Sequence, residues 1–340
     1  MTCGRDALET HGWHTRRMVT TSHEAVAALY RQFATEEVRD ISPLYDEICT
    51  GIAEDAQVLE LIGTLPRPKW QPNLLLAAWK LVHGIASGYP EFRERLLDEP
   101  EAVLSVMRTH ATQTNEAARC ATTLPVLASI EGPIALFEVG PSAGLCLFPD
   151  RYHYRYLLDD DVIEVGEPSG VDLECVVTGP MPVPTRLPEV VWRGGIDLNP
   201  LDIRDDEAVR WLRALIWPEQ TERLERLDAA IAIARTERTQ VVTGNADTAF
   251  EAALAAVPRA ATLVVLNTAA ATYFPPDARE RFAERANRAG VWISQEAPGV
   301  FPSVAAMLPV RAPLGRFVLS RNGEPLAFTA PHGGTIDWIE

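Results

Sequence analysis

The pattern of apolar and polar residues along this 340-residue chain changes character near residue 132. Before that point apolar side chains recur at the spacing of amphipathic helices, as at Val26, Leu29 and Phe33 after a capping Ser22. Further helices are expected after Ser42-Pro43 and over 74–85, 99–110 and 114–128. The sequence therefore predicts a helical cap domain over residues 22–131, preceded by a weakly ordered polar lead at 1–21.

After Gly132-Pro133, short apolar runs alternate with helical patterns. The expected strands are 134–139, 189–196, 239–243, 261–267 and 290–294, and the helical patterns between the last four are 205–235, 247–256 and 276–288. Strands that alternate with helices favour a mainly parallel sheet covered on both faces. We therefore expect a Rossmann-like α/β domain over residues 132–340.

Two segments of this domain are typical of hairpins. Within 151–187, the alternating run Tyr152–Tyr156, an acidic turn at Asp159–Asp161 and the run Asp172–Val177 predict an inserted antiparallel hairpin. Near the end of the chain, Asn322-Gly323 separates 316–319 from 326–329 and is typical of a type I′ turn.

The end of the first strand has the most informative residues, Glu138-x-Gly140-x-x-x-Gly144. A strand, a glycine turn and a helix in this order present backbone N–H groups and a helix N-terminus to a nucleotide-like ligand. Glu138, Gly140, Ser142 and Gly144 are therefore candidate cofactor-binding residues. The same residues also spell Gly140-x-Ser142-x-Gly144, the nucleophile elbow of α/β hydrolases.

Polar residues also end the later strands. Asp197 is placed to accept the ribose hydroxyls of a cofactor, or alternatively to cap the next helix or loop. Asn245, Ala246 and Asp247 are candidates for an adenine pocket, although Asp247 is equally suited to an ordinary helix cap. Asn267 lies at the carboxyl end of its strand, where ligands bind in open α/β sheets.

A polar cluster precedes the first strand. Asn115, Glu116 and Arg119 fall within the helix expected over 114–128, and Gln113 directly precedes it. This helix should pack near the glycine turn, which makes the four residues candidates for substrate contacts. The alternative is a solvated pair between Glu116 and Arg119. Tyr152 is a further candidate for substrate binding.

Composition narrows the class of protein. The formal net charge of −16 argues against nucleic acid or an anionic membrane as a partner. Five scattered cysteines without a Cys-x-x-Cys pair argue against a disulfide framework or a zinc site. No apolar run approaches the ~20 residues of a membrane span, and no secretory signal is evident. We expect a cytoplasmic protein that acts on a small molecule.

The series Glu138, Asp197, Asp247 and Asn267 resembles the cofactor side of class I S-adenosylmethionine (SAM) methyltransferases. Ser142 stands where those enzymes typically have the middle glycine of their first motif. The resemblance implies a SAM-dependent methyltransferase in which Glu116 or Glu296 is the candidate base and Asn267 lies near the reacting groups.

A second resemblance covers nearly the whole chain after residue 22. Its landmarks are Ser42-Pro43-Leu44-Tyr45, Gln71-Pro72-Asn73, Gln113-Thr114-Asn115-Glu116, Asp150-Arg151-Tyr152, Gly195-x-Asp197-Leu198, Trp217-Pro218 and Pro331-His332-Gly333. This set is similar to the bacterial domain of unknown function 2332 family, whose name implies no reaction. Trp79-Lys80-Leu81-Val82 departs from the His and Tyr that the resemblance leads us to expect.

Two other hypotheses remain open. A SAM- or nucleotide-binding module would bind the cofactor without transferring a methyl group. A serine hydrolase would use Ser142, an acid such as Asp277 or Glu296, and His332, which satisfies the required chain order. The mostly helical sequence before Ser142 counts against the hydrolase, because that fold builds several strands before its elbow.

Overall fold

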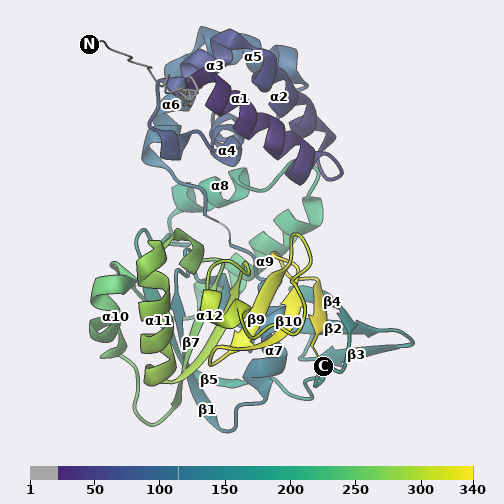
Figure 1. Ribbon diagram of the computed structural model, residues 1–340, viewed down its shortest axis with the longest axis vertical. Helices are drawn as coiled ribbons and strands as arrows, with labels where there is room; N and C mark the ends of the chain where they lie inside the picture. Colours follow the sequence, from purple (N-terminus) through teal and green to yellow (C-terminus); the bar gives the residue numbers. More distant parts are fainter. Residues whose placement is uncertain (1–21, 114, 340) are drawn as a thin grey trace, which may run out of the picture. The chain divides into compact units, whose positions relative to one another are not determined.

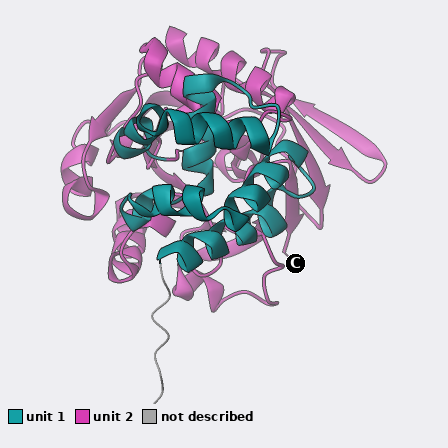
Figure 2. Cartoon of the chain, turned by 90° about the horizontal axis from the view of Figure 1, so that it is seen from above, with its two compact units in different colours: residues 1–111 teal, residues 112–340 magenta. Residues whose placement is uncertain are grey.

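The computed structural model describes residues 22–113 and 115–339. The chain divides into two compact units between residues 111 and 112 (Figure 2). The division expected from the sequence was at 131/132, so the last expected helix, which ends at Ala128, falls in the second unit. The expectation for residues 1–21 lies outside the described residues.

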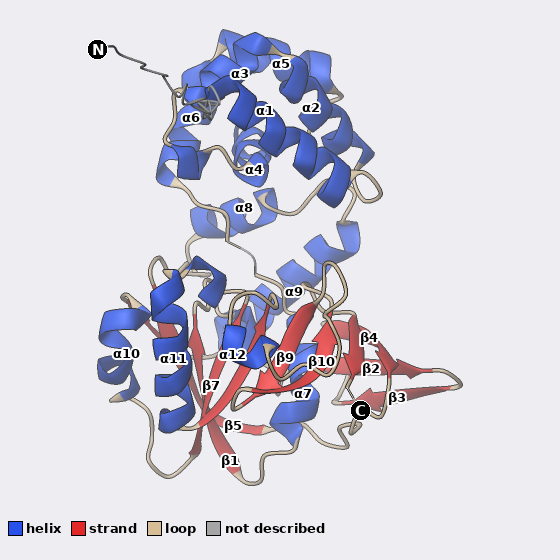
Figure 3. Ribbon diagram, in the orientation of Figure 1, coloured by secondary structure: helices blue, strands red, loops and turns tan. Residues whose placement is uncertain are grey.

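The first unit is helical, as the sequence predicts (Figure 3). Its helices are α1 (Ser22–Phe33), α2 (Pro43–Glu54), α3 (Ala56–Gly63), α4 (Pro72–His83), α5 (Tyr89–Asp98) and α6 (Pro100–Thr109), with shorter turns η1 (Ala34–Val38) and η2 (Arg67–Lys69). The start of α2 illustrates why helices begin at these positions. Ser42 Oγ accepts a hydrogen bond from Tyr45 N at 3.2 Å, and Pro43 occupies the first turn, where its missing N–H costs nothing.

The second unit is built on an 11-stranded sheet of order β3-β2-β4-β11-β10-β9-β8-β7-β1-β5-β6. Its strands are β1 (Pro133–Val139), β2 (His153–Leu158), β3 (Asp161–Val165), β4 (Asp172–Thr178), β5 (Glu189–Asp197), β6 (Gln240–Thr243), β7 (Thr262–Thr268), β8 (Val291–Glu296), β9 (Phe317–Arg321), β10 (Glu324–Thr329) and β11 (Thr335–Trp338). Its helices are α7 (Arg119–Ala128), α8 (Asp206–Ala214), α9 (Thr221–Thr236), α10 (Ala246–Leu254), α11 (Pro276–Ala289) and α12 (Pro302–Ala305), with turns η3 (Leu145–Leu147) and η4 (Ala271–Tyr273).

The part β6-β5-β1-β7-β8 is entirely parallel, and its order reverses at β1. From β1 the chain reaches β5 and then β6 on one side, and later β7 and β8 on the other. This is a doubly wound arrangement, in which ligands bind beyond the carboxyl ends of the strands at the reversal. The expected mainly parallel α/β sheet is thereby confirmed.

The sheet has an apolar core on each face. On one face, α7 and α9 pack on residues such as Leu136 and Val264. On the other face, where Figure 1 shows α10 and α11, Phe250 and Phe282 of these helices form a cluster with Phe137. Alternate side chains of β1 therefore point into different cores, because successive residues of a strand face opposite sides.

The two expected hairpins have different outcomes. The C-terminal one is confirmed as β9 and β10, and both Asn322 (φ 53°) and Gly323 (φ 86°) have the positive φ that a type I′ turn requires. In the inserted segment, β2 pairs antiparallel with β3, which begins at the last residue of the expected acidic turn, whereas β4 runs parallel to β2. The expected pairing of 152–156 with 172–177 as a hairpin was therefore wrong. The residues that follow the acidic turn alternate only weakly between apolar and polar side chains, so the pattern did not predict the strand β3 that they form.

The helix expected directly after the glycine turn is also absent. Gly144 is followed only by η3, and the chain then runs irregularly to β2. Similarly, the pattern over 205–235 forms two helices, α8 and α9, and α7 begins at Arg119 rather than near 114. Trp217-Pro218 separates α8 from α9, because a proline disfavours helical backbone at the residue before it.

Candidate functional site

The glycine turn after β1 is held in a strained and closely packed conformation. Gly140, Ser142 and Gly144 have φ of 77°, 52° and 74°, in the left-handed region that favours glycine. A Cβ added at Gly140 would lie 2.5 Å from Ala270 Cβ, so only glycine fits there. The positive φ of Ser142 is a conformation that glycine would adopt without strain.

Every backbone N–H in this turn is used within the protein. The N–H groups of Gly140, Ser142, Ala143 and Gly144 donate, in that order, to Ile196 O, Asp197 Oδ2, Asn115 Oδ1 and Pro141 O over 2.7–2.9 Å. The expectation that the turn presents free N–H groups and a helix N-terminus to a ligand was therefore wrong. A ligand at this turn would therefore contact the outer surface of its backbone and the side chains that hold it in place.

Two of the predicted residues brace the turn from different elements. Asn115 Nδ2 donates to Ser142 Oγ at 2.7 Å, and Asn115 Oδ1 accepts from Ala143 N at 2.8 Å. Asp197, at the end of β5, accepts from Ser142 N and from Asn199 N, both at 2.8 Å. Gln113 Nε2 donates to Asn199 O at 2.8 Å. The structure therefore gathers these residues around one turn, with Asp197 half-buried beside it.

Leu198 is a feature of this region that sequence reasoning did not single out. It follows Asp197 directly, and its side chain is 68% exposed. An exposed leucine next to a half-buried carboxylate provides an apolar surface beside a hydrogen-bond acceptor. The sequence motif Asp197-Leu198 contained the residue, but its exposure depends on the fold.

Glu138 lies beneath the turn, on the face of the sheet covered by α7. It follows Ile134 and Leu136 in the alternation of β1, and both of these belong to the core on that face. Glu138 is 2% exposed, and its Oε2 has no hydrogen-bond partner among the described residues. Burial raises the pKa of Glu138 well above its ordinary value, and the charge of Arg119 offsets this only in part.

Glu116 is the centre of a buried ion cluster. Its carboxylate lies 2.7 Å from Arg223 Nε and 2.9 Å from Arg226 Nε, both near the start of α9, and it also accepts from Ala118 N. Burial alone would raise the pKa of Glu116, but the two guanidinium charges outweigh that effect and lower it. A carboxylate stabilised in this way is a weak base, so the geometry does not favour Glu116 as a proton acceptor.

Arg119 and the C-terminal turn adjoin this cluster. The expected pair between Glu116 and Arg119 does not form, because Arg119 donates to Pro331 O at 2.8 Å and to Thr268 O at 3.1 Å. A Cβ at Gly333 would lie 2.2 Å from Ala118 O, which shows how closely the Pro331–Gly333 turn packs on the start of α7. This close contact explains why position 333 of the Pro331-His332-Gly333 motif is a glycine.

The residues proposed for a hydrolase do not form a triad. His332 is exposed, while partial desolvation by the surrounding protein, and then the charges of Arg223 and Arg119, lower its pKa. Ser142 Oγ is bound by Asn115, and within the described residues no hydrogen bond joins it to His332. Asp277 forms an exposed ion pair with Arg281 on α11.

Asn267 and Glu296 lie together, but on the face of the sheet opposite to Glu138. Asn267 Nδ2 donates to Glu296 Oε1 at 2.8 Å, and Trp292 Nε1 donates to Asn267 Oδ1 at 2.7 Å. Glu296 Oε1 also accepts from Ala270 N and Ala271 N at 2.8 Å. Burial raises the pKa of Glu296 despite these bonds. The polar strand ends therefore form two groups rather than one series.

The residues expected to shape an adenine pocket are engaged in local contacts. Asn245, and not Asp247, caps α10 by accepting from Asp247 N at 2.8 Å. The Asp247 carboxylate lies 3.2 Å from Arg281 and 3.7 Å from Arg285 on α11. Ala246 is 7% exposed and belongs to the apolar core of that face.

The segment after the glycine turn is fixed by a buried ion pair that the sequence did not reveal. Arg193 of β5 makes two hydrogen bonds to Asp150, of 2.8 and 3.0 Å, and both side chains are less than a tenth exposed. Tyr152 is fully buried, and its hydroxyl donates to Leu145 O at 2.7 Å. Tyr152 therefore supports this segment and is not available at the surface for substrate.

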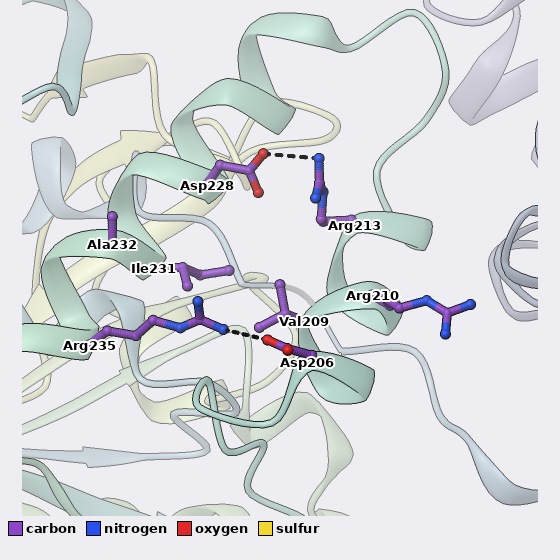
Figure 4. A pocket seen from close by; sticks show the side chains of 8 residues that line it. All are labelled: Asp206, Val209, Arg210, Arg213, Asp228, Ile231, Ala232 and Arg235. Carbon is purple, nitrogen blue, oxygen red and sulfur yellow. Dashed lines mark hydrogen bonds and ion pairs between the residues drawn. The ribbon is translucent and has the colours of Figure 1, made fainter.

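A separate open pocket of about 360 Å³ lies between α8 and α9. It is lined by Asp206, Val209, Arg210, Arg213, Asp228, Ile231, Ala232 and Arg235 (Figure 4). Two ion pairs, Arg213–Asp228 at 3.3 Å and Arg235–Asp206 at 3.2 Å, connect the two helices across it. The lining residues include none of the site residues expected from the sequence.

The described residues contain no helix with the length and apolarity needed to cross a membrane. Comparison with curated proteins finds no match, and neither does comparison with solved structures. The family model for an uncharacterized protein conserved in bacteria, DUF2332, matches residues 27–338. Because this match covers most of the chain, including the glycine turn and every element around it, the protein belongs to the DUF2332 family of bacterial proteins.

Proposed function

We propose that this protein is a SAM-dependent methyltransferase acting on a small-molecule acceptor. The observation that supports the proposal most directly is the position of Asp197. This carboxylate ends the strand next to β1, braces the glycine turn and lies at the reversal of a doubly wound sheet. Ligands bind at that place in such folds.

The chemistry of the surrounding side chains fits the cofactor. Each oxygen of Asp197 accepts one backbone hydrogen bond, whereas a carboxylate has about four acceptor sites in all. The remaining sites suit the two hydroxyls of a ribose. Leu198, exposed beside it, suits the face of an adenine.

Glu138 supplies a second point of fit. A buried carboxylate oxygen without a partner is costly unless a ligand satisfies it. The cofactor has a positively charged amino group, whose charge would lower the pKa of Glu138 and favour the ionised form that accepts a hydrogen bond from it. Gly140 and Gly144 shape the turn between the two carboxylates, and Asn245, Ala246 and Asp247 lie farther along at the end of β6.

When bound, SAM supplies a methyl group activated by its sulfonium. The contribution of the protein would be to orient the acceptor and exclude water, which accounts for much of the rate in such transfers. Because Glu116 is neutralised by two arginines, an acceptor that is already nucleophilic suits this site better than one that must first lose a proton.

The test is isothermal titration with SAM and with S-adenosylhomocysteine. Asp197 also braces the turn, so a loss of binding in Asp197→Asn alone would have two explanations. Leu198→Ser removes only an exposed side chain, and Leu314→Ser, at another exposed leucine, is its matched control. We expect Leu198→Ser, but not Leu314→Ser, to weaken binding several-fold.

The proposal would be overturned if neither SAM nor S-adenosylhomocysteine binds to the wild-type protein. In that event, labelling of Ser142 by a fluorophosphonate would be the next experiment, and the positive φ of this residue is the feature that favours it. Binding without methyl transfer to any acceptor would instead identify a SAM-binding module.

A further inference from the structure

The side chains of α9 that contact Glu116 are both arginines and lie near the start of the helix. Arg223 and Arg226 share one carboxylate, that of Glu116. Cationic side chains are normally placed near the C-terminus of a helix, because the N-terminus already has a partial positive charge. Two arginines in the first turns of α9 therefore oppose the usual preference.

Glu222 and Glu225, on the same helix, are exposed, and among the described residues neither forms an ion pair with Arg223 or Arg226. The buried acidic groups nearby do not balance the two arginines either. Burial raises the pKa of Glu138 and of Glu296 and so favours the neutral form of each, whereas the charge of Arg119 opposes this shift only in part. Desolvation and the other two arginines also lower the pKa of Arg223. The cluster thus has two guanidinium groups on a single stabilised carboxylate, and a third, that of Arg119, is near enough to lower the pKa of Arg223.

The cluster also has donors that the protein leaves open. Arg226 uses Nε to bind Glu116, and its two Nη groups have no hydrogen-bond partner within the described residues. Its side chain is 25% exposed, so solvent and ligands can reach it. No side chain caps the start of α9, which leaves backbone N–H groups there unsatisfied by a cap.

We propose that Arg226 and Arg223, at the start of α9, form a binding site for the carboxylate or phosphate group of a small molecule. A guanidinium fork binds such groups through two parallel hydrogen bonds, and the helix N-terminus favours the same charge. The guanidinium group of Arg119 adds further positive charge close to Arg223. Glu116 acts as a positioning residue that orients both forks through their Nε atoms.

Which molecule contributes the anionic group rests on the proposed function, whereas the site itself does not. In a methyltransferase, the anion would be either the acid group of the acceptor or the carboxylate of the amino-acid tail of the cofactor. Both sources have the same chemistry, and they can be separated by experiment.

The experiment begins with inorganic phosphate alone, titrated calorimetrically into the full chain. Arg226→Gln should weaken phosphate binding about tenfold or more, as expected for loss of a charged hydrogen-bonding group. Arg226→Lys should restore part of the affinity, because it keeps the charge without the fork. The matched control is Arg213→Gln, which removes an exposed arginine of α8 paired with Asp228. Thermal unfolding of each variant verifies that it is folded.

Phosphate that fails to bind the wild-type protein, or that binds Arg226→Gln and Arg213→Gln with equal affinity, would overturn the site. The phosphate titration needs no cofactor, so it tests the anion site even if S-adenosylhomocysteine does not bind and the proposed function fails. Conversely, the site can fail while the cofactor still binds.

The source of the anion follows from competition. If the cofactor tail occupies the site, phosphate should weaken the binding of S-adenosylhomocysteine but not that of 5′-methylthioadenosine, which lacks the tail. If the acceptor occupies it, phosphate and S-adenosylhomocysteine should bind together, and Arg226→Gln should leave S-adenosylhomocysteine affinity unchanged. Either pattern supports the anion site.

Discussion

Asp197 accepts a hydrogen bond from the backbone N–H of Ser142 at 2.8 Å, which ties the end of β5 to the turn that follows β1. This contact, 55 residues apart in sequence, holds Ser142 at a φ of 52°. A non-glycine residue in the left-handed region costs about 1–2 kcal/mol. The candidate cofactor carboxylate therefore also stabilises a strained turn.

Substitutions at Ser142 separate this strain from the side-chain hydrogen bond. Ser142→Ala and Ser142→Gly both lose the bond to Asn115, but only glycine relieves the positive φ. We expect Ser142→Gly to be more stable than Ser142→Ala by about 1 kcal/mol in urea unfolding. Equal stability of the two variants would show that the backbone strain is relieved in some other way.

Gly140 and Gly132 form a matched pair for testing close packing. Both have positive φ, but a Cβ at Gly140 would lie 2.5 Å from Ala270 Cβ, whereas nothing lies within 4 Å at Gly132. Gly132→Ala should cost about 1 kcal/mol from the backbone alone. Gly140→Ala should cost at least about 2 kcal/mol more, because the turn must also move. Denaturant unfolding of both variants measures the difference, and similar costs would contradict the packing argument.

The buried Glu138 should make stability depend on pH. Burial raises its pKa in the folded state, so its favourable contribution is present below the unfolded pKa of about 4.3 and is lost as the pH rises toward the folded value. Glu138→Gln removes this loss. The stability of the variant relative to wild type should therefore increase as the pH rises above the unfolded pKa, as measured by thermal unfolding.

Glu164→Gln, at an exposed position of β3, is the control for this experiment. Its stability difference from the wild-type protein should change little over the same range. A Glu138→Gln difference that shrinks with rising pH would show that the buried carboxyl is stabilised in its ionised form.

Breaking the Asp150–Arg193 pair should be strongly destabilising, because loss of the Asp150 carboxylate leaves the buried guanidinium of Arg193 without its counter-ion. Asp150→Asn is expected to cost about 3–5 kcal/mol. Glu174→Gln breaks the exposed Arg155–Glu174 pair of 2.6 Å and should cost no more than about 1 kcal/mol. Urea unfolding compares the two, and a small loss for Asp150→Asn would mean that solvent reaches the pair.

Local patterns in the sequence were sufficient for most elements of the fold. Apolar runs such as 134–139 and 261–267 became β1 and β7, because a strand buried on both faces needs little more than continuous apolar residues. Asn322-Gly323 specified its hairpin, since few other residues adopt two successive positive φ values. Residue type and order likewise singled out the glycine turn, Asn115, Ser142 and Asp197, which the structure brings into contact.

The partners of these residues depended on tertiary structure. Nothing in the sequence joins Arg226 to Glu116, 110 residues away, or Arg193 to Asp150, because ion pairs between distant elements follow from how the helices and strands pack. The alternation of β1 and β7 placed Glu138 and Asn267 on opposite faces of the sheet, although the sequence order suggested one series. The sequence by itself determined which residues are polar at the ends of strands. Only the tertiary structure decided which of them meet, because strand register and helix packing set the distances between their side chains.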